Sequence, residues 1–348
     1  MHTTPRLTQH VPLMLGRRAA LLLPFTVGLT LTACGGGGDT ESATPSGETR
    51  VVTDVEDKEV TVPVSPQRVI TLSEPTLDAA LALGVTPVGT VAGRGQSTVP
   101  NYLAEKAGDV PLLGTVSQLD YEAIGATEPD LILVDGTSVN NRPDVLEILN
   151  QIAPVVFTGY AGGPWELNFD NVAEALNRAE EGAKVKSDYE ALITETATAL
   201  AENYSDKTFS IVRWQGSGPS LILKELPAGQ VLEDLGLARP ASQDRLGRGH
   251  SEPVSLENLA TIDADYMFLG TLGGASQENP NSDSIADLAG AAEALKRAEQ
   301  TSGFTDLQAY KDDHIILVDG SQWTSTGGPL LLLGIVTDVK KALLDSAQ

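Results

Sequence analysis

The side chains best suited to hold a ligand are scarce in this chain, and most of them fall in loops that follow predicted strands. Aromatic residues make up 5% of the 348 residues, and 23 Lys and Arg stand against 47 Asp and Glu. Trp and Tyr offer a flat apolar surface with a polar tip, and Arg can fork onto carboxylate oxygens while staying charged. The candidate ligand-binding residues are Arg94, Tyr160, Trp165, Arg213, Trp214, Arg245, Arg248, His250 and Trp323.

Some of these candidates have an equally good structural interpretation. Trp214 and Trp323 fit a core position as well as a cleft, and Tyr160 and Trp165 flank a glycine pair in a loop. In a chain this acidic, a few clustered positive charges would attract an anionic ligand. We therefore expect an anion-binding site, with the core alternative left open for the aromatic residues.

The sequence argues against catalysis, a metal centre and nucleic-acid binding. It contains no HExxH, CxxC or GxSxG motif, and its single cysteine excludes an internal disulfide. His314 follows two aspartates at the start of a predicted strand, where a structural role is expected. An acidic chain lacks the basic stripe that would neutralise phosphates.

The apolar pattern predicts an α/β protein in which strands and helices alternate. Nearly all-apolar strands of this kind indicate mostly parallel sheets that helices cover on both faces. The expected strands are 68–72, 88–91, 130–134, 154–158, 208–212, 266–269 and 314–318, with a hairpin over 50–63. The expected helices are 76–83, 121–127, 142–152, 229–235, 256–262 and 330–344, and a turn is expected at 73–75. Ligands of such sheets bind beyond the carboxyl ends of the strands.

The two halves of the chain resemble each other. Glu122 and Asp130 bracket a short helix and the start of a strand, and Glu257 and Asp265 repeat the pattern 135 residues later. A helix also ends in Leu-Gly in each half, at Gly84 and Gly236. The repeat predicts two similar doubly wound α/β lobes.

The stretch 168–203 predicts one long, rigid helix between the lobes. It contains no proline and one glycine, and its apolar residues recur at gaps of three and four. The alternative is two helices broken near Glu180–Gly182. We expect an N-terminal lobe over 50–167, a linking helix over 168–203 and a C-terminal lobe over 204–348, with small lobe movements because the linking helix is stiff.

The N-terminus predicts export and a lipid anchor. Arg6, Arg17 and Arg18 precede the apolar run 19–31, which is short for a membrane span and ends in Leu-Thr-Ala before Cys34. The pattern resembles a bacterial lipoprotein signal over 1–33 with lipidation at Cys34, and an uncleaved anchor is the alternative. Residues 34–49 form a flexible tether. The chain released by cleavage carries 20 basic and 47 acidic residues, since three of the 23 basic residues are lost, and we expect a soluble, self-repelling monomer.

Several passages, in order, resemble one family. They are Pro66–Ile70, Asp78–Val85, Tyr121–Ile132, Val212-Arg213, Val231–Gly236 and Val254–Glu257, all behind the lipoprotein signal. Together they resemble the substrate-binding lipoproteins of ATP-driven importers, of the iron–siderophore/cobalamin type in which one long helix joins two lobes.

The resemblance implies a binding protein and not an enzyme. It would capture a ferric siderophore in the cleft between the lobes and deliver it to an ABC permease and its ATPase, while lipid-anchored on the extracytoplasmic face of the membrane. Haem or cobalamin is the alternative ligand, and His250 could ligate the iron of haem or of an incompletely coordinated chelate. No resident cofactor is implied.

The resemblance also assigns a role to the repeated glutamates. A carboxylate on each lobe of such proteins meets arginines of the two permease subunits, so Glu122 and Glu257 are expected to form a docking pair. The alternative is that each carboxylate only stabilises the N-terminus of its helix.

Overall fold

The computed structural model describes residues 47–139, 142–247, 249–274 and 285–345. These residues belong to one compact unit, Thr40–Gln348. The leader 1–33, Cys34, the tether up to residue 46 and Arg248 lie outside the described residues. Among the helices that the structure describes, none is both long and apolar enough to cross a bilayer.

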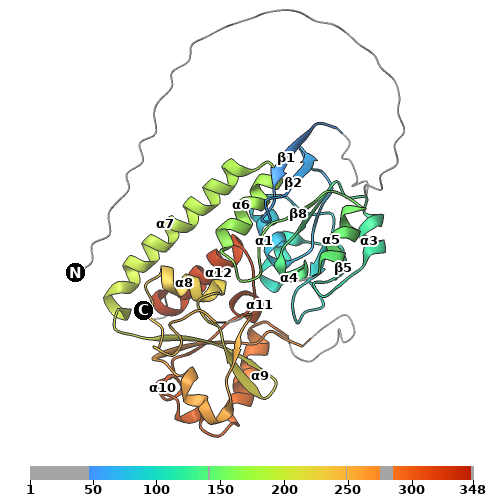
Figure 1. The fold of residues 1–348 in the computed structure, drawn as a ribbon. Coiled ribbons are helices and arrows are strands. Elements are labelled where there is room, and N and C mark those ends of the chain that lie inside the picture. The colour runs from blue at the N-terminus through green and yellow to red at the C-terminus, as the bar shows by residue number, and fades with distance from the viewer. Residues whose placement is uncertain (1–46, 140–141, 248, 275–284, 346–348) are drawn as a thin grey trace, which may run out of the picture. The chain divides into compact units, whose positions relative to one another are not determined.

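The part of the chain before the long helix, here the N-terminal lobe, alternates strands and helices (Figure 1). Its strands are β1 (Thr49–Thr53), β2 (Glu59–Pro63), β3 (Val69–Thr71), β4 (Thr90–Ala92), β5 (Leu112–Thr115), β6 (Gln118–Leu119), β7 (Leu131–Val134) and β8 (Val155–Phe157). Its helices are α1 (Glu74–Ala82), α2 (Ala104–Ala107), α3 (Tyr121–Ala126), α4 (Gly136–Val139), α5 (Pro143–Asn150) and α6 (Trp165–Ala175). Strands β3, β7 and β8 are parallel neighbours, β4 pairs in parallel with β5, and β1 and β2 form the expected hairpin.

The part after the long helix, here the C-terminal lobe, is built in the same way. Its strands are β9 (Phe209–Gln215), β10 (Gly218–Leu221), β11 (Glu252–Pro253), β12 (Tyr266–Gly270) and β13 (Ile315–Leu317). Its helices are α8 (Pro227–Asp234), α9 (Leu288–Glu299), α10 (Gln308–Lys311), α11 (Gly320–Trp323) and α12 (Pro329–Lys340). Strands β9, β12 and β13 are parallel, and β10 and β11 extend the sheet antiparallel. The predicted α/β class with mostly parallel sheets is confirmed.

The internal repeat corresponds to equivalent contacts in the two sheets. The Asp130 carboxylate, just before β7, accepts hydrogen bonds from the backbone of Gln67 and Arg68, which lead into β3. The Asp265 carboxylate, just before β12, accepts one from the backbone of Thr208, which leads into β9. In each lobe, therefore, an aspartate at the start of one parallel strand fixes the start of its neighbour.

The long helix is shorter than the sequence predicts. Helix α7 spans Ala179–Tyr204, and α6 ends before it, so a single helix over 168–203 is wrong. Asn177 adopts a left-handed conformation with φ +57°, and the backbone N–H of Arg178 donates to the carbonyl of Ala173 at 2.7 Å. This is a helix-terminating Schellman motif with asparagine in place of glycine. Gly182 lies inside α7, where an added Cβ would stand 3.0 Å from the Cβ of Ala173, so it permits close helix packing.

Two smaller differences concern the ends and types of helices. Helix α1 begins at Glu74 and not at Thr76, because Ser73 and Thr76 form a reciprocal capping box where a turn was expected. The helix predicted over 256–262 is a 3₁₀ helix, Leu256–Ile262. Helix α9 and several shorter elements, among them β5, β6, β10, α2 and α11, were not predicted.

Helix α12 belongs to the C-terminal lobe, but an N-terminal-lobe residue caps it. Its N-cap residue, Gly328, has no side chain that could satisfy the free N–H groups of the first turn. The Asp78 carboxylate on α1 takes this role and accepts from the backbone N–H groups of Leu330 and Leu331, at 2.9 Å each. Burial raises the pKa of Asp78 from 3.8 to about 6, although these hydrogen bonds oppose the shift.

The buried carboxyl of Asp78 predicts a pH dependence of stability. Its folded-state pKa lies above the unfolded value, so the folded protein takes up a proton as the pH falls through about 6 and the unfolded chain does not. Between pH 7 and pH 5 this group should add on the order of 1 kcal/mol to the free energy of unfolding, a gain that is lost as the pH rises again. Thermal unfolding of Asp78→Asn should show a correspondingly smaller rise in Tm over this range.

The exposed Asp109 provides the matched control. Asp109→Asn should keep the pH dependence of the unaltered chain. An equal pH dependence in Asp78→Asn and the unaltered chain would show that Asp78 does not titrate in this range.

Candidate functional site between the lobes

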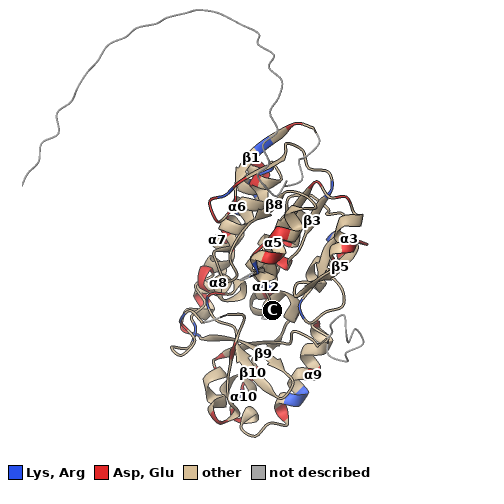
Figure 2. Cartoon of the chain, turned by 45° about the vertical axis from the view of Figure 1, so that its right-hand side comes forward, with Lys and Arg blue, Asp and Glu red and all other residues tan. Residues whose placement is uncertain are grey.

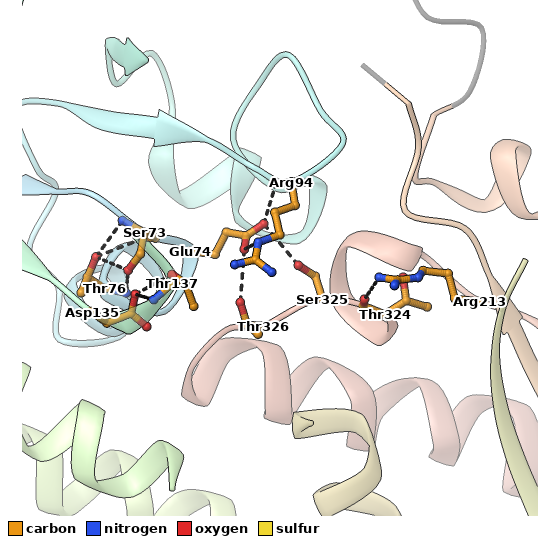
Figure 3. Close-up of polar contacts among 10 residues, drawn as sticks. All are labelled: Ser73, Glu74, Thr76, Arg94, Asp135, Thr137, Arg213, Thr324, Ser325 and Thr326. Carbon is orange, nitrogen blue, oxygen red and sulfur yellow. Dashed lines mark hydrogen bonds and ion pairs between the residues drawn. The ribbon is translucent and has the colours of Figure 1, made fainter. Parts of the chain in front are cut away.

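Two of the predicted arginines come from different lobes and are held on either side of one buried segment (Figure 3). Arg94 lies in the loop after β4, where its backbone N–H donates to Glu74 Oε1 at 2.7 Å and its Nε stands 3.8 Å from Glu74 Oε2. Arg213 is a half-buried residue of β9, which runs on past the predicted strand end. Its Nη1 donates to the carbonyl of Thr324 at 3.2 Å, and its Nη2 donates to the Ser251 hydroxyl.

The buried segment is Thr324–Thr326, which connects α11 to the start of α12. The hydroxyls of Ser325 and Thr326 donate to the two oxygens of Glu74, each at 3.2 Å. Glu74 itself is only 2% exposed. Its burial raises the pKa of its carboxyl, and the charge of Arg94 and the hydrogen bonds oppose that rise. The segment thus contacts Arg213 directly and Arg94 through Glu74.

His250 lies near both arginines and is uncharged at neutral pH. Burial, followed by the positive charges of Arg94 and Arg213, lowers the pKa of His250 from 6.5 to about 4. Burial and the charge of Arg94 also lower the pKa of Arg213. The structure therefore brings Arg94, Arg213 and His250 together, with two fixed positive charges and a neutral imidazole. Such a group suits an anionic ligand, because guanidinium groups donate charge-assisted hydrogen bonds to oxyanions.

A small cavity of about 40 Å³ also opens between the lobes. Tyr160 and Trp165 line it with the buried Asp135, and Glu225 and Thr326 line it from the C-terminal lobe. Tyr160 is 50% exposed, whereas Trp165 is 7% exposed and packs edge-on against Tyr189. Burial raises the pKa of Asp135, which accepts hydrogen bonds from Thr137. This part of the interface combines aromatic surface with hydrogen-bond acceptors.

The structure does not bring every predicted residue into this region. Trp214 and Trp323 are both fully buried, Trp214 against Phe304 and Trp323 stacked on Phe268, so the prediction that they contact ligand is wrong and the core alternative holds.

One further candidate, Arg245, is engaged elsewhere, and His314 was predicted to be structural. Arg245 is exposed and makes a bidentate ion pair with Glu252. His314 stacks on Tyr266, as expected for a structural residue.

Sequence reasoning missed the acids and hydroxyls that hold the arginines. Glu74 directly follows the capping residue after β3, and Asp135 directly follows β7, so both stand at carboxyl ends of parallel strands. That position, where ligands of such sheets bind, was the available signal for both acids. Thr324–Thr326 gave no comparable signal.

The groups gathered in this region are of the kind that bind polar ligands. Among the described residues, no group of three or more His, Cys, Asp or Glu side chains could hold a metal ion. The polar groups that converge here are guanidinium donors, carboxylates that accept hydrogen bonds, and hydroxyls.

The two repeated glutamates are exposed, each near the start of a short helix. Glu122 lies in the first turn of α3, whose N-cap Asp120 accepts from the backbone of Ala123. Glu257 lies in the first turn of the 3₁₀ helix after Ser255. Neither belongs to the residues that surround the arginines. The acidic excess of the chain is spread over helices of both lobes (Figure 2).

Two α/β lobes, a long connecting helix and a group of two arginines and a histidine between the lobes are the features of a solute-binding protein. Comparison with known proteins agrees: the chain belongs to the periplasmic binding protein family, whose model matches residues 69–321. It is a substrate-binding protein and not an enzyme.

Relatives and solved structures extend over most of the chain. The probable siderophore-binding lipoprotein YfiY of Bacillus subtilis is 28% identical over 309 residues, which cover 86% of this chain and 90% of the relative. The Fe(3+)-citrate-binding protein YfmC of the same organism is 29% identical over 239 residues, covering 67% and 71%. The fold is similar to that of Staphylococcus aureus SirA complexed with staphyloferrin B, with a TM-score of 0.69, 22% identity and coverage of 85% and 98%.

The charge arrangement around His250 predicts how its pKa responds to substitution. Removing either nearby positive charge should raise the pKa of His250, because protonation then costs less electrostatic work. We expect Arg94→Ala and Arg213→Ala each to raise it, as measured by NMR titration of the imidazole ring protons.

Arg297, an exposed arginine on α9, provides the control, since Arg297→Ala should leave the pKa of His250 unchanged. Equal His250 titrations in all three variants would mean that the arginines do not surround this imidazole.

Proposed function

We propose that this protein is an extracytoplasmic receptor that binds a ferric siderophore between its lobes and delivers it to an ABC permease and its ATPase. The observation that carries the proposal is the convergence of Arg94, Arg213 and the neutral His250 from both lobes. Ferric siderophores commonly present anionic oxygens at their surface, and guanidinium groups recognise such oxygens. Relatives named for binding siderophores and ferric citrate support this ligand class.

Tyr160 and Trp165 would add aromatic contact from the N-terminal lobe. Both line the cavity that opens between the lobes, and an aromatic face suits the organic scaffold of a chelate. Arg245 and Arg248 follow β10 and α8 in the chain and stay predicted ligand contacts, although Arg245 is ion-paired with Glu252. The assignment of these residues remains part of the proposal.

Anchoring and domain organisation complete the proposal. A lipid on Cys34 and a flexible tether over 34–49 would hold the receptor, as a monomer, on the extracytoplasmic face of the membrane. Residues 50–167 and 204–348 would form the lobes. The break at Asn177 shortens the linking helix proposed between them to Ala179–Tyr204.

A fluorescence titration tests the ligand. Ferric hydroxamate, catecholate and citrate chelates and haem should be compared, and we expect at least one ferric chelate to quench tryptophan emission saturably. Trp165→Phe should remove most of the quenching, because Trp214 and Trp323 are fully buried. Arg94→Ala and Arg213→Ala should each weaken affinity by about 10- to 100-fold, the value of a charge-assisted hydrogen bond.

Arg178→Ala, at an exposed arginine paired with Glu181, is the matched control and should bind normally. A Soret shift with haem that His250→Ala abolishes would instead assign haem as the ligand. Absence of saturable binding to every ferric chelate would refute the proposal.

The proposed docking pair is tested by uptake rather than by binding. Glu122→Ala and Glu257→Ala should each reduce permease-dependent uptake of the bound chelate by at least about 10-fold, because each removes one partner of an interface ion pair. The Kd for the chelate should not change. Glu180→Ala alters another exposed first-turn glutamate, on α7, and should leave uptake intact. Normal uptake by the Glu122→Ala, Glu257→Ala double variant would rule out the docking role.

A further inference from the structure

We infer that Glu74 is the positioning residue that orients Arg94 toward the ligand, and that the segment Thr324–Thr326 ties this orientation to the C-terminal lobe. The inference rests on the proposed function, because it takes Arg94 as a ligand contact. It gives a role to Glu74, a buried acid whose negative charge would not itself attract an anion.

Glu74 holds Arg94 at two points. One carboxylate oxygen accepts the backbone N–H of Arg94 at 2.7 Å and so fixes the loop after β4. The other stands 3.8 Å from Nε of the same residue and so directs its side chain. Among the described residues, no hydrogen bond engages the Nη groups of Arg94. A guanidinium held through its Nε edge keeps the donors at its far end for an oxyanion.

The position of Glu74 is in turn set from the other lobe. The hydroxyls of Ser325 and Thr326 occupy one oxygen each, and all three side chains are buried. Consecutive residues of the same segment therefore reach both arginines, because the Thr324 carbonyl accepts from Arg213. The relative placement of the two guanidinium groups depends on this three-residue segment (Figure 3).

A purely structural role for Glu74 is the competing explanation. Buried carboxylates are costly unless several donors satisfy them, and Glu74 has three such donors. If those contacts served stability alone, removing the charge of Glu74 would change affinity by the same factor whether or not Arg94 is present. If Glu74 positions Arg94, the two residues must be coupled in binding.

A double-mutant cycle separates the two explanations. The Kd of a ferric chelate that binds in the titration panel is measured for the unsubstituted protein, for Arg94→Ala, for Glu74→Gln and for the double variant. Glutamine retains the size of glutamate; its oxygen can accept from the Arg94 N–H, and its amide can donate to the Thr326 hydroxyl. We expect Arg94→Ala to weaken binding about 30-fold alone and no more than about 3-fold in the Glu74→Gln background.

A second double-mutant cycle tests Glu74 through Thr326, its hydrogen-bond donor in the C-terminal lobe. Thr326→Val removes a hydroxyl that donates to Glu74, and it should reduce the effect of Arg94→Ala. Thr324→Val is the matched comparison, since the Thr324 hydroxyl donates to the carbonyl of Gly320 and not to Glu74. In that background Arg94→Ala should retain its full effect. Thermal unfolding without ligand checks that each variant is folded, so the second cycle decides the question if Glu74→Gln unfolds.

The outcomes are distinguishable. Additive losses in both cycles would overturn the inference and leave the proposed function intact. Tighter binding by Glu74→Gln, with a larger effect of Arg94→Ala, would also overturn it, because Glu74 would then compete with the ligand for Arg94. Chelate binding that Arg94→Ala does not weaken would remove Arg94 from the site, and no binding to any ferric chelate would end the proposed function itself.

Discussion

Two carboxylates on helix α1 fix helix α12 of the C-terminal lobe against the N-terminal lobe, and the arrangement of residues between the lobes depends on this attachment. Glu74 and Asp78 are four residues apart and so share one face of α1. Asp78 caps the first turn of α12, and Glu74 accepts from the segment that leads into it. At Gly328 an added Cβ would stand 2.9 Å from Asp78 Oδ1, so glycine lets the backbone approach the carboxylate this closely.

The same attachment gives two positive charges defined positions in an acidic protein. The positive charges that matter are few, so their positions must be well defined. Arg94 lies in a loop and depends on the buried carboxylate of Glu74 for its position. Because burial raises the pKa of Glu74, this carboxylate needs several hydrogen-bond donors in fixed places. The segment Thr324–Thr326 supplies those donors and an acceptor for Arg213. The net charge of the chain therefore gives little information about how a ligand would be recognised here, whereas the local hydrogen bonds of the two arginines give much.

The elements that could be predicted are those that short stretches of sequence specify. All-apolar runs located the parallel strands, and Gly84 and Gly236 marked helix ends that the structure shows with φ of +74° and +71°. The internal repeat around Asp130 and Asp265 could be recognised from the sequence because each aspartate directly precedes an apolar strand. The break before α7 was missed because Asn177 ends the helix, and asparagine is a weaker signal than glycine or proline.

The composition of the site could be predicted only in part. Their position after predicted strands favoured Arg94 and Arg213, and the structure brings both near His250. For Trp214 and Trp323 the sequence could not separate core from cleft, because burial is decided by which elements pack across the sheet. The role of Glu74 could not be predicted for a related reason, because its partners, Ser325 and Thr326, are about 250 residues away in the chain.

The attachment of α12 to α1 is also one of the connections that join the two lobes. A rigid linking helix would by itself limit lobe movement, but α7 is shorter than the sequence predicts and is preceded by a break. A single core cluster instead runs from Leu131 in β7 through Phe169 in α6 and Leu332 in α12 to Phe268 in β12. A wide opening of the lobes would separate apolar surfaces and leave the carboxylates of α1 without their donors, and both changes cost free energy. We therefore expect resistance to lobe opening to come mainly from this shared core and from the capping of α12, with α7 as one of the surfaces against which α12 packs.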